Sequence, residues 1–335
     1  MPRIVGEQNE RDHNKTISVD QFRLNHTSMV DFLDTQHIFY IEITKNEESY
    51  EQRNVLKICR IADKAVVDTF DLPLDLNLQE HNYLIHRDVG SRVALLILDN
   101  GFYNLKLDSN WRILSSEFIM RDFEYTCATV DDGKIYYLEE SEVDDDDVHY
   151  QIFVEGLRGE HHRRLLEWTC TVVEDIYVER DILFLFDIAR LLIVDVKTSE
   201  QVYVEMNHIN PYPDTIESLY NPTLECYVVF FRGNENYKCL ILQKDLTYQI
   251  FETGIEVSDE ESFNLITHNM FIVDGKVRVI KNFDFSSKSV LFACIDIPNE
   301  CEDFIAIKEN MIACAHYDDD DIYDEYSFVT TLYYE

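Results

Sequence analysis

Strand-like segments recur along nearly the whole chain, and this repetition constrains the fold more than any other feature. Seven strong apolar runs begin at residues 38, 93, 135, 182, 227, 277 and 311, and long stretches of helical periodicity are nearly absent. The runs lie roughly 45 residues apart on average, and a period between about 20 and 50 residues is typical of modular repeat folds. The sequence therefore predicts an all-β fold built from repeated modules.

Each module is expected to contain four antiparallel strands. A strong run such as His37–Thr44 is followed by another such as Asn54–Ile61, and a further strand, Ala65–Leu72, follows the polar turn Asp63-Lys64. A polar turn between two alternating apolar segments is a hairpin signal. Weaker first strands precede the strong runs, for example Tyr83–Val89.

Four antiparallel strands in about 40–50 residues are the pattern of one β-propeller blade. Over residues 16–335 the chain resembles the WD-repeat-like β-propeller superfamily in spacing and hairpin pattern. It has neither the Gly-His pair nor the Trp-Asp ending of that family, and Trp occurs only at Trp111 and Trp168. The resemblance is one of architecture, so it assigns no functional residue.

The two ends of the chain suggest how such a propeller closes. The last module, residues 303–335, ends without a fourth strand, whereas Thr16–Leu24 supplies a spare strand before the first module. We expect residues 1–15 to be a flexible segment and residues 16–335 to form a single domain. That domain is predicted to be a seven-bladed propeller with four strands per blade, closed by the N-terminal strand so that no sheet edge stays open.

Two alternatives to this fold remain. Phe304–Glu309 fits either the fourth strand of the sixth module or the first strand of the seventh, so six blades are possible. A pair of β-sandwich domains is the other alternative, although no Pro/Gly/Ser-rich linker separates two such domains.

The charge of the chain is strongly negative and unevenly distributed. With 65 Asp and Glu against 29 Lys and Arg, the formal net charge is −36, which argues against direct binding to nucleic acids or anionic membranes. Three predicted connections between second and third strands, Lys45–Asn54, Glu139–Val148 and Tyr317–Tyr326, contain 16 acidic and two basic residues. Connections of this type share one face of a propeller, whereas the basic cluster Arg158–Arg164 falls in a third-to-fourth strand turn on the other.

An acidic face favours a Lys/Arg-rich protein segment as the partner, through faster association and salt-sensitive binding. The alternative is that these loops are only solvated and keep a β-rich protein soluble. The predicted partner-binding residues are Glu47, Glu48, Glu139, Glu140, Glu142, Asp144, Asp145, Asp146, Asp147, Asp318, Asp319, Asp320, Asp321, Asp324 and Glu325.

No motif indicates a catalytic residue, a metal site or a cofactor. The patterns GxSxG, GxxxxGK[ST] and GxGxxG do not occur, and the two runs of four Asp lack the spaced ligands and the Gly of a calcium loop. Asp131-Asp132-Gly133 and Asp274-Gly275 are expected to be turns between first and second strands. The eight Cys form no CxxC pair and are expected to be mainly buried free thiols in strands.

These features predict a non-enzymatic protein–protein interaction scaffold or adaptor subunit of an intracellular complex. The N-terminus lacks the apolar segment of a signal peptide, and the longest aliphatic run, Val93–Leu98, is too short to span a membrane, so we expect a cytoplasmic or nuclear protein. A monomer or a subunit of a hetero-complex is favoured. Two alternatives are a chaperone of histones or other basic proteins, and a propeller hydrolase or lyase with its site in the central channel.

Overall fold

The computed structural model describes most strands of the chain and the shorter connections between them. The described residues are 22–25, 27–34, 36–45, 52–72, 85–88, 93–98, 101–120, 128–141, 148–170, 173–187, 190–205, 216, 218–257, 263–273, 276–296, 303–308, 311–317 and 328–334. All regular elements in these ranges are β-strands. Within them, no helix is long and apolar enough to cross a membrane.

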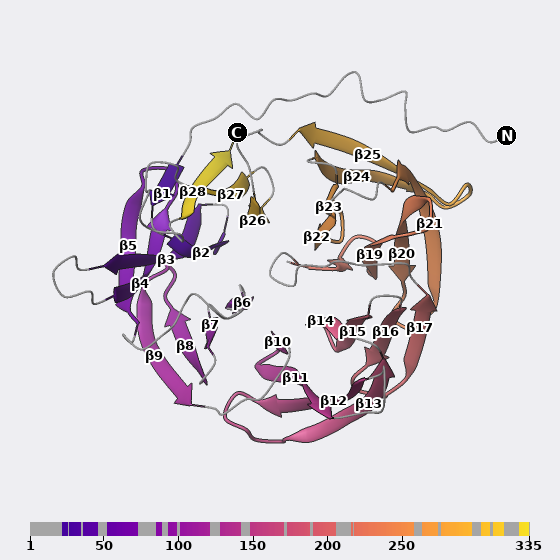
Figure 1. The fold of residues 1–335 in the computed structure, drawn as a ribbon, viewed down its shortest axis with the longest axis horizontal. Helices are drawn as coiled ribbons and strands as arrows, with labels where there is room; N and C mark the ends of the chain where they lie inside the picture. The colour runs from indigo at the N-terminus through magenta and orange to yellow at the C-terminus, as the bar shows by residue number, and fades with distance from the viewer. Residues whose placement is uncertain are drawn as a thin grey trace. The chain divides into compact units, whose positions relative to one another are not determined.

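Contacts between residues divide the chain into two compact units. Unit 1 contains Met1–Thr16 and Glu124–Ile297, and unit 2 contains Ile17–Phe123 and Pro298–Glu335. In both units consecutive strands pair as antiparallel meanders, which is the arrangement that short polar turns between apolar segments predict (Figure 1).

Unit 2 contains three four-stranded sheets. The first is formed by β2 (Thr27–Phe32), β3 (His37–Lys45), β4 (Gln52–Arg60) and β5 (Ala65–Asp71). The second is formed by β6 (Ile85–Asp88), β7 (Val93–Leu98), β8 (Gly101–Leu107) and β9 (Ile113–Met120). The third combines β26 (Asp303–Lys308), β27 (Met311–Tyr317) and β28 (Phe328–Tyr334) with β1 (Phe22–Asn25).

Unit 1 begins with two more four-stranded sheets. One is formed by β10 (Ala128–Asp131), β11 (Lys134–Ser141), β12 (Val148–Gly156) and β13 (Arg163–Cys170). The next is formed by β14 (Val173–Glu179), β15 (Ile182–Asp187), β16 (Arg190–Asp195) and β17 (Gln201–Glu205).

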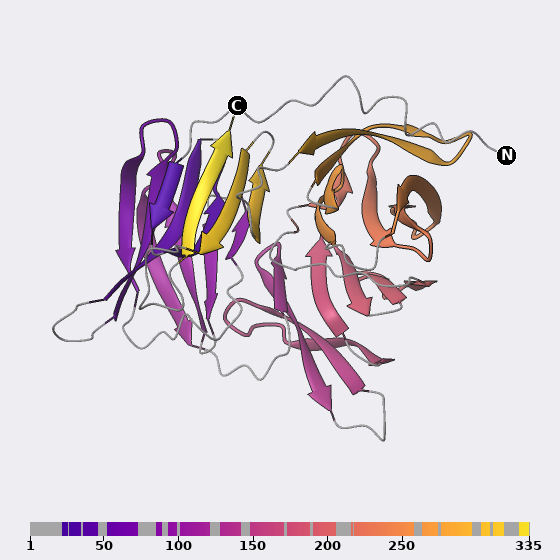
Figure 2. The ribbon, with the colours of Figure 1, turned by 45° about the horizontal axis from the view of Figure 1, so that its top comes forward.

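The remaining strands of unit 1 form an eight-stranded sheet made of two meanders (Figure 2). The first meander contains β18 (Tyr220–Asn221), β19 (Cys226–Arg232), β20 (Asn236–Leu242) and β21 (Tyr248–Glu256). The second contains β22 (Phe263–Thr267), β23 (Met270–Val273), β24 (Lys276–Asp284) and β25 (Ser289–Asp296). They join where β21 lies parallel to β25, with Glu252 opposite Ser289.

An N-terminal strand completes the sheet formed by the C-terminal strands. β1 pairs antiparallel with β28, and Phe22 lies opposite Leu332. The expected strand was longer, Thr16–Leu24, and its first six residues lie outside the described part of the chain. Residues 1–15, expected to be flexible, also lie outside it.

The second meander of the eight-stranded sheet corrects two details of the sequence interpretation. Asp274-Gly275 connects β23 to β24, the second and third strands, rather than the first and second. The strong runs in this meander are accordingly its third and fourth strands. β23 was not recognised because it has four residues, all buried, and therefore no alternating pattern. Phe304 pairs with Cys314 of β27, so β26 is the first strand of the last sheet.

Burial follows the position of each strand within its sheet. Every residue of the central strand β15 is buried, and so are the four middle residues of β16, which explains their continuous apolar runs. The outer strand β17 is largely exposed, with Val204 its one buried residue. The apolar pattern thus distinguishes inner strands, covered on both faces, from outer strands, covered on one.

Neighbouring sheets within each unit pack through apolar clusters. In unit 1 an aromatic cluster joins the β14–β17 sheet to the eight-stranded sheet, with Phe184 and Tyr227 5.6 Å apart between ring centroids. Within the eight-stranded sheet, Phe230 and Phe271, 4.3 Å apart, connect its two meanders. In unit 2, Trp111 belongs to a smaller cluster between the β2–β5 and β6–β9 sheets. Burial of such side chains stabilises the fold by about 1.5–3 kcal/mol each.

The expected buried free thiols are found in four strands. Cys59, Cys170, Cys226 and Cys239 are buried and unbonded to one another, and Cys294 is half-buried. Burial raises the pKa of the Cys59 and Cys226 thiols to about 11 each, so they remain protonated and poorly nucleophilic at neutral pH.

Candidate functional site

The acidic segments predicted from the sequence occupy equivalent connections. They link β3 to β4, β11 to β12 and β27 to β28, which are the second and third strands of three different four-stranded sheets. Two of the predicted binding residues, Glu139 and Glu140, are strand residues, because β11 extends to Ser141. The predicted loop over 139–148 is therefore shorter than expected, and it begins after Ser141.

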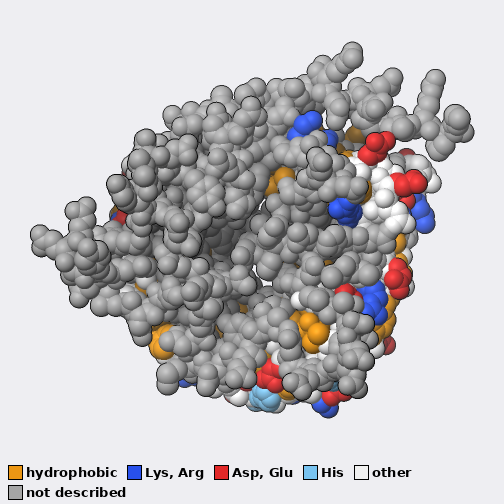
Figure 3. Space-filling view, in the orientation of Figure 1, with side chains coloured by type: hydrophobic (Ala, Val, Ile, Leu, Met, Phe, Trp, Pro, Cys, Tyr) orange, Lys and Arg blue, Asp and Glu red, His pale blue; other side chains and the backbone are white. Residues whose placement is uncertain are grey.

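Glu139 is exposed, and Glu140 lies opposite Tyr150 of β12. On the face shown in Figure 3, the acidic and basic side chains of the described residues are interspersed. The remaining predicted residues lie outside the described part of the chain: Glu47, Glu48, Glu142, Asp144, Asp145, Asp146, Asp147, Asp318, Asp319, Asp320, Asp321, Asp324 and Glu325.

The basic cluster forms the turn between β12 and β13, which is a third-to-fourth strand turn as expected. The backbone N–H of Gly156 donates to the carbonyl oxygen of Glu160 (2.7 Å), and that of Arg158 donates to its Oε2 (2.9 Å). A Cβ on Gly156 would lie 2.1 Å from Glu160 Oε1, so a larger residue there would displace the Glu160 side chain from its bond to Arg158.

The side chains of His161 and His162, which are adjacent in this turn, lie in different surroundings. His162 Nδ1 lies 3.1 Å from Oε2 of the buried Glu155, and its ring stacks on Phe153 at 5.1 Å between centroids. His161 instead lines a cavity. In the described residues, no group of three or more His, Cys, Asp or Glu is arranged to hold a metal ion.

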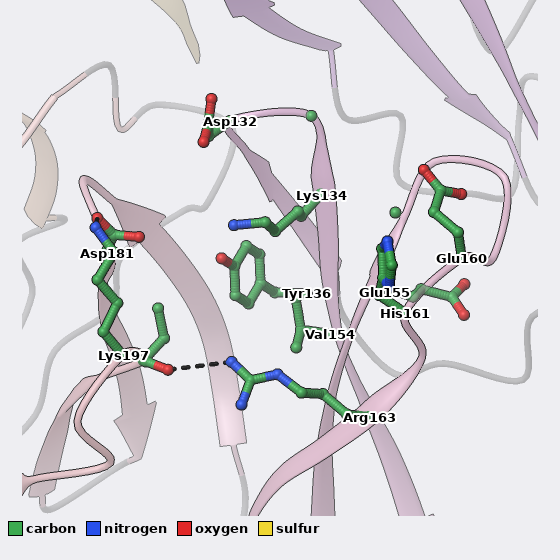
Figure 4. Close-up of a pocket in the computed structure, with 13 residues that line it drawn as sticks. Asp132, Lys134, Tyr136, Val154, Glu155, Glu160, His161, Arg163, Asp181 and Lys197 are labelled. Carbon is green, nitrogen blue, oxygen red and sulfur yellow. Dashed lines mark hydrogen bonds and ion pairs between the residues drawn. The ribbon is translucent and has the colours of Figure 1, made fainter.

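This cavity, of about 280 Å³, lies within unit 1 and is formed by turns and strand ends of the β10–β13 and β14–β17 sheets (Figure 4). We call the packing of these two sheets the polar junction, defined by Asp131, Tyr136 and Asp181. The cavity is lined by Asp132, Gly133, Lys134, Tyr136, Val154, Glu155, Gly156, Glu160, His161, Arg163, Asp181, Val196 and Lys197.

Two tight hairpin turns bring the charged groups of the polar junction together. Asp132 and Gly133 have φ of 47° and 70°, and Arg180 and Asp181 have φ of 52° and 68°. Two consecutive residues with positive φ define a type I′ turn, whose twist matches that of the paired strands. The expected Asp131-Asp132-Gly133 turn between first and second strands is thereby confirmed.

The cations of the polar junction are held by nearby oxygen atoms. Lys197 Nζ lies 2.5 Å from Asp181 Oδ2, and Arg163 Nη2 donates to the carbonyl oxygen of Val196 at 3.2 Å. Burial raises the pKa of Asp131, although the backbone N–H of Asp181 donates to its carboxylate and opposes that shift. Burial also raises the pKa of the Tyr136 phenol, so Tyr136 is a hydrogen-bond donor at neutral pH.

The next pair of sheets in unit 1 is connected differently. We call the packing of the β14–β17 sheet against β18–β21 the aromatic junction, defined by Glu179, Phe184 and Tyr227. The Glu179 carboxylate accepts hydrogen bonds from Ser218 Oγ (2.6 Å) and from the backbone N–H groups of Leu219 (2.7 Å) and Tyr220 (2.9 Å). The Tyr227 hydroxyl donates to the carbonyl oxygen of Glu179 at 3.2 Å. The Glu179 carboxylate thus joins two sheets, and both of its oxygen atoms accept hydrogen bonds.

The sequence alone does not identify the cavity residues. The Asp-Gly turn predicts only that Lys134 stands at the start of a strand, β11. Arg163 begins β13 of the same sheet, and Lys197 lies in a turn of the neighbouring sheet, so sheet pairing and sheet packing together bring them near Lys134. A single sequence contains no indication of that proximity.

No family model and no curated protein matches the sequence. Among solved structures, the chain is similar to the acylaminoacyl peptidase of Pyrococcus horikoshii, with a TM-score of 0.50 and 10% identity over 87% of this chain. The match covers 49% of the peptidase chain, so the present chain corresponds to about half its length.

Similar structures also include domains whose fold is named. One is the WD40 domain of Neurospora crassa Pan2, with a TM-score of 0.46, 9% identity and coverage of 92% of this chain and 89% of that one. Another is the β-propeller domain of the Trilobed protease from Pyrococcus furiosus, with a TM-score of 0.46, 10% identity and coverage of 87% and 91%.

The class of protein is therefore defined by its architecture. Repeated four-stranded antiparallel meanders are the building blocks of β-propellers. At identities of 9–10% the similarities to solved structures concern the fold and assign no activity.

Proposed function

We propose that this chain is a seven-bladed β-propeller, closed by β1 in its last blade, that acts as a non-enzymatic interaction module for a basic protein segment. The carrying observation is that all three acid-rich segments connect second to third strands. In one closed propeller such connections share a face, so at least 16 of the 65 acidic residues would gather there.

Two physical arguments support a basic partner. A concentrated negative potential accelerates association with a Lys/Arg-rich segment, and it weakens as salt screens it. The turns at the opposite strand ends include the basic cluster Arg158–Arg164, so the two ends of the β10–β13 sheet differ in charge. A partner attracted to acidic side chains would discriminate between these ends.

The test uses the full chain and a fluorescent Lys/Arg-rich peptide of about ten residues as the probe. One variant replaces Asp144, Asp145, Asp146 and Asp147 by Asn. We expect it to weaken peptide binding at least fivefold at about 50 mM salt, and to flatten the salt dependence. Fluorescence anisotropy at about 50 and 200 mM salt measures both effects.

A matched control changes the net charge by the same amount elsewhere. Its four substitutions affect exposed side chains of unit 1 at turns between first and second or between third and fourth strands, which lie at the opposite strand ends: Glu200→Gln, Glu225→Gln, Asp245→Asn and Asp284→Asn. If this control weakens binding as much as the Asp variant, the attraction comes from net charge alone and the acidic-face proposal is wrong. Affinity purification from native extract at the same two salt concentrations would then identify the physiological partner.

The proposed closure has a separate test. Class averages from electron microscopy should show a ring with seven radial blades. Deletion of residues 1–25 should destabilise the last sheet, because β28 would lose its partner strand β1. Six blades, or two separate sandwich domains, would contradict the proposed architecture.

A further inference from the structure

The cavity of the polar junction contains donors that the fold itself does not use. Tyr136 is 1% exposed, its ring packs in the apolar cluster between two sheets, and its hydroxyl faces the cavity (Figure 4). Among the described residues, none forms a hydrogen bond with this hydroxyl. The ring is buried while its hydroxyl lines the cavity, so a ligand there could supply the hydrogen-bond partner that the fold does not.

Two cations point into the same space. Lys134 is half-buried, makes no ion pair with a described residue, and extends its ammonium group beside the Tyr136 ring (Figure 4). Arg163 is held by its bond to the carbonyl oxygen of Val196 and has further N–H groups available. A guanidinium, an ammonium and a phenol from β11 and β13 therefore line one wall of the cavity.

Most acidic groups of the lining have partners. Asp181 pairs with Lys197, Glu155 contacts His162, and the Glu160 carboxylate accepts the backbone N–H of Arg158. Asp132 is exposed in the tight turn at the edge of the cavity. The donors of Lys134, Tyr136 and Arg163 are thus available to a ligand in this cavity.

We propose that this cavity binds a carboxylate group, held by Lys134, Tyr136 and Arg163. The planar Arg fork matches a carboxylate, and an ammonium and a phenol supply further donors. A monoanion suits the site better than a phosphate, because Asp132 and Asp181 would repel a doubly charged group more strongly. The volume is just below the range for drug-sized ligands, so the cavity would admit a small carboxylic acid or the C-terminal residue of a peptide.

This site is independent of the proposed acidic face. It is formed by turns between first and second strands and between third and fourth strands, whereas the acidic segments connect second to third strands. Either proposal can therefore fail without the other.

The test is a titration followed by NMR of tyrosine-labelled protein, in which the Tyr136 resonance is assigned by its loss in Tyr136→Phe. The probes are acetyl-dialanine with a free carboxylate, the same dipeptide as its C-terminal amide, and inorganic phosphate. We expect the free carboxylate to shift the Tyr136 resonance saturably, and the amide and phosphate to bind at least tenfold more weakly. Lys134→Met should raise the Kd of the carboxylate about tenfold, as expected for one lost charge-assisted hydrogen bond.

The chain contains a matched control for this variant. Lys276 follows an Asp-Gly pair, begins strand β24 and is half-buried, as Lys134 is in its own hairpin, yet it lies outside the cavity lining. Lys276→Met should leave the Kd unchanged. Equal affinity for carboxylate and amide, tighter binding of phosphate, absence of any saturable shift, or equal effects of the two Lys variants would overturn the proposal.

Two further probes separate the sources of the carboxylate. N-acetylalanine presents the group on a small molecule, and an acetylated peptide of about five residues presents it at a chain terminus. A peptide that binds at least fivefold more tightly than N-acetylalanine identifies a protein C-terminus as the ligand. Equal affinities identify a small carboxylic acid.

Discussion

The polar and aromatic junctions of unit 1 both pack one sheet against the next, but different side chains fill the space between the sheets. At both, the hairpin between the first two strands of one sheet meets the next sheet. Tyr136 and Phe184 occupy the same place in their sheets, two residues after the start of the second strand. Phe184 packs against Tyr227, whereas the phenol of Tyr136 faces a cavity of about 280 Å³.

The difference comes from the side chains opposite these two rings. At the aromatic junction, Tyr227 of the following sheet fills the space and its hydroxyl donates to the Glu179 carbonyl oxygen. At the polar junction, the corresponding second residue of β15 is Leu183, which is smaller and has no polar end. The aromatic junction is therefore filled by its own side chains, whereas the polar junction leaves a cavity and hydrogen-bond donors that a ligand could use.

The largest expected effect is at the aromatic junction. Phe184→Ala removes a ring that is 0% exposed, so it should lower the free energy of unfolding of unit 1 by about 4 kcal/mol. Urea denaturation followed by the fluorescence of Trp168, in a Trp111→Phe background, measures this change. Tyr203→Ala is the control, because Tyr203 lies in the same sheet, is 46% exposed, and its loss should matter by less than about 0.5 kcal/mol. Similar losses in both variants would contradict the assignment of the core.

The next effect concerns the carboxylate that joins the two sheets. Glu179→Ala leaves two backbone N–H groups and the Ser218 hydroxyl without their acceptor, and should destabilise unit 1 by about 3 kcal/mol. The same urea experiment applies, with Glu200→Gln as a surface control. A change below about 1 kcal/mol would mean that water replaces Glu179 and that the junction is held by apolar packing alone.

A smaller effect distinguishes the two tyrosine hydroxyls directly. Tyr227→Phe removes a bond to the Glu179 carbonyl oxygen and should destabilise the protein by about 1 kcal/mol. Tyr136→Phe removes a hydroxyl that has no acceptor among the described residues, so the unfolding free energy should stay the same or rise slightly. Equal losses in the two variants would show that the Tyr136 hydroxyl is bonded within the free protein.

The smallest effect is a pH dependence of opposite sign at two turn carboxylates. Burial raises the pKa of Asp131 above its ordinary 3.8, so its charged form opposes folding at neutral pH, and this penalty is lost as the pH falls through the raised pKa. In unit 2, bonds from Gln36, His37 and Trp111 lower the pKa of Asp34 below 3.8 despite the opposing effect of burial. Its stabilising contribution is present above pH 3.8 and is lost as the pH falls through the lowered pKa.

Unfolding free energies of Asp131→Asn and Asp34→Asn, each relative to the wild type, test these signs across the acidic range. Asp131→Asn should be relatively most stable near neutral pH and lose this advantage on acidification. Asp34→Asn should be least stable near neutral pH and approach the wild type at low pH. Parallel curves for the two variants would contradict the different surroundings assigned to these carboxylates.

The strands themselves were largely predictable from local patterns. Continuous apolar runs such as those of β15 and β16 identified inner strands, and Asp132-Gly133 identified a tight hairpin, because residues with positive φ are needed there. The short strand β23 was missed, since four consecutive buried residues do not alternate. The strand-like residues Glu139 and Glu140 were placed in a loop because their charge obscured the end of β11.

The two candidate sites, the acidic segments and the cavity, also differ in how far the sequence indicates them. The acidic segments were visible as charge runs, and their connection type followed once the strands were recognised. The cavity was not visible, because Lys134, Tyr136 and Arg163 have no distinctive spacing in the sequence. Their relationship depends on the turn that returns the chain from β12 to β13 and on the sheet that packs beside them.

The sequence by itself thus determined the strand repeat, the hairpin turns and the distribution of charge, because these depend on residues close together in the chain. The tertiary structure decided which carboxylates join sheets, which tyrosine hydroxyl finds an acceptor, and where a cavity remains. Those outcomes depend on whether a side chain from one sheet fills the space left by its neighbour, as Tyr227 does and Leu183 does not.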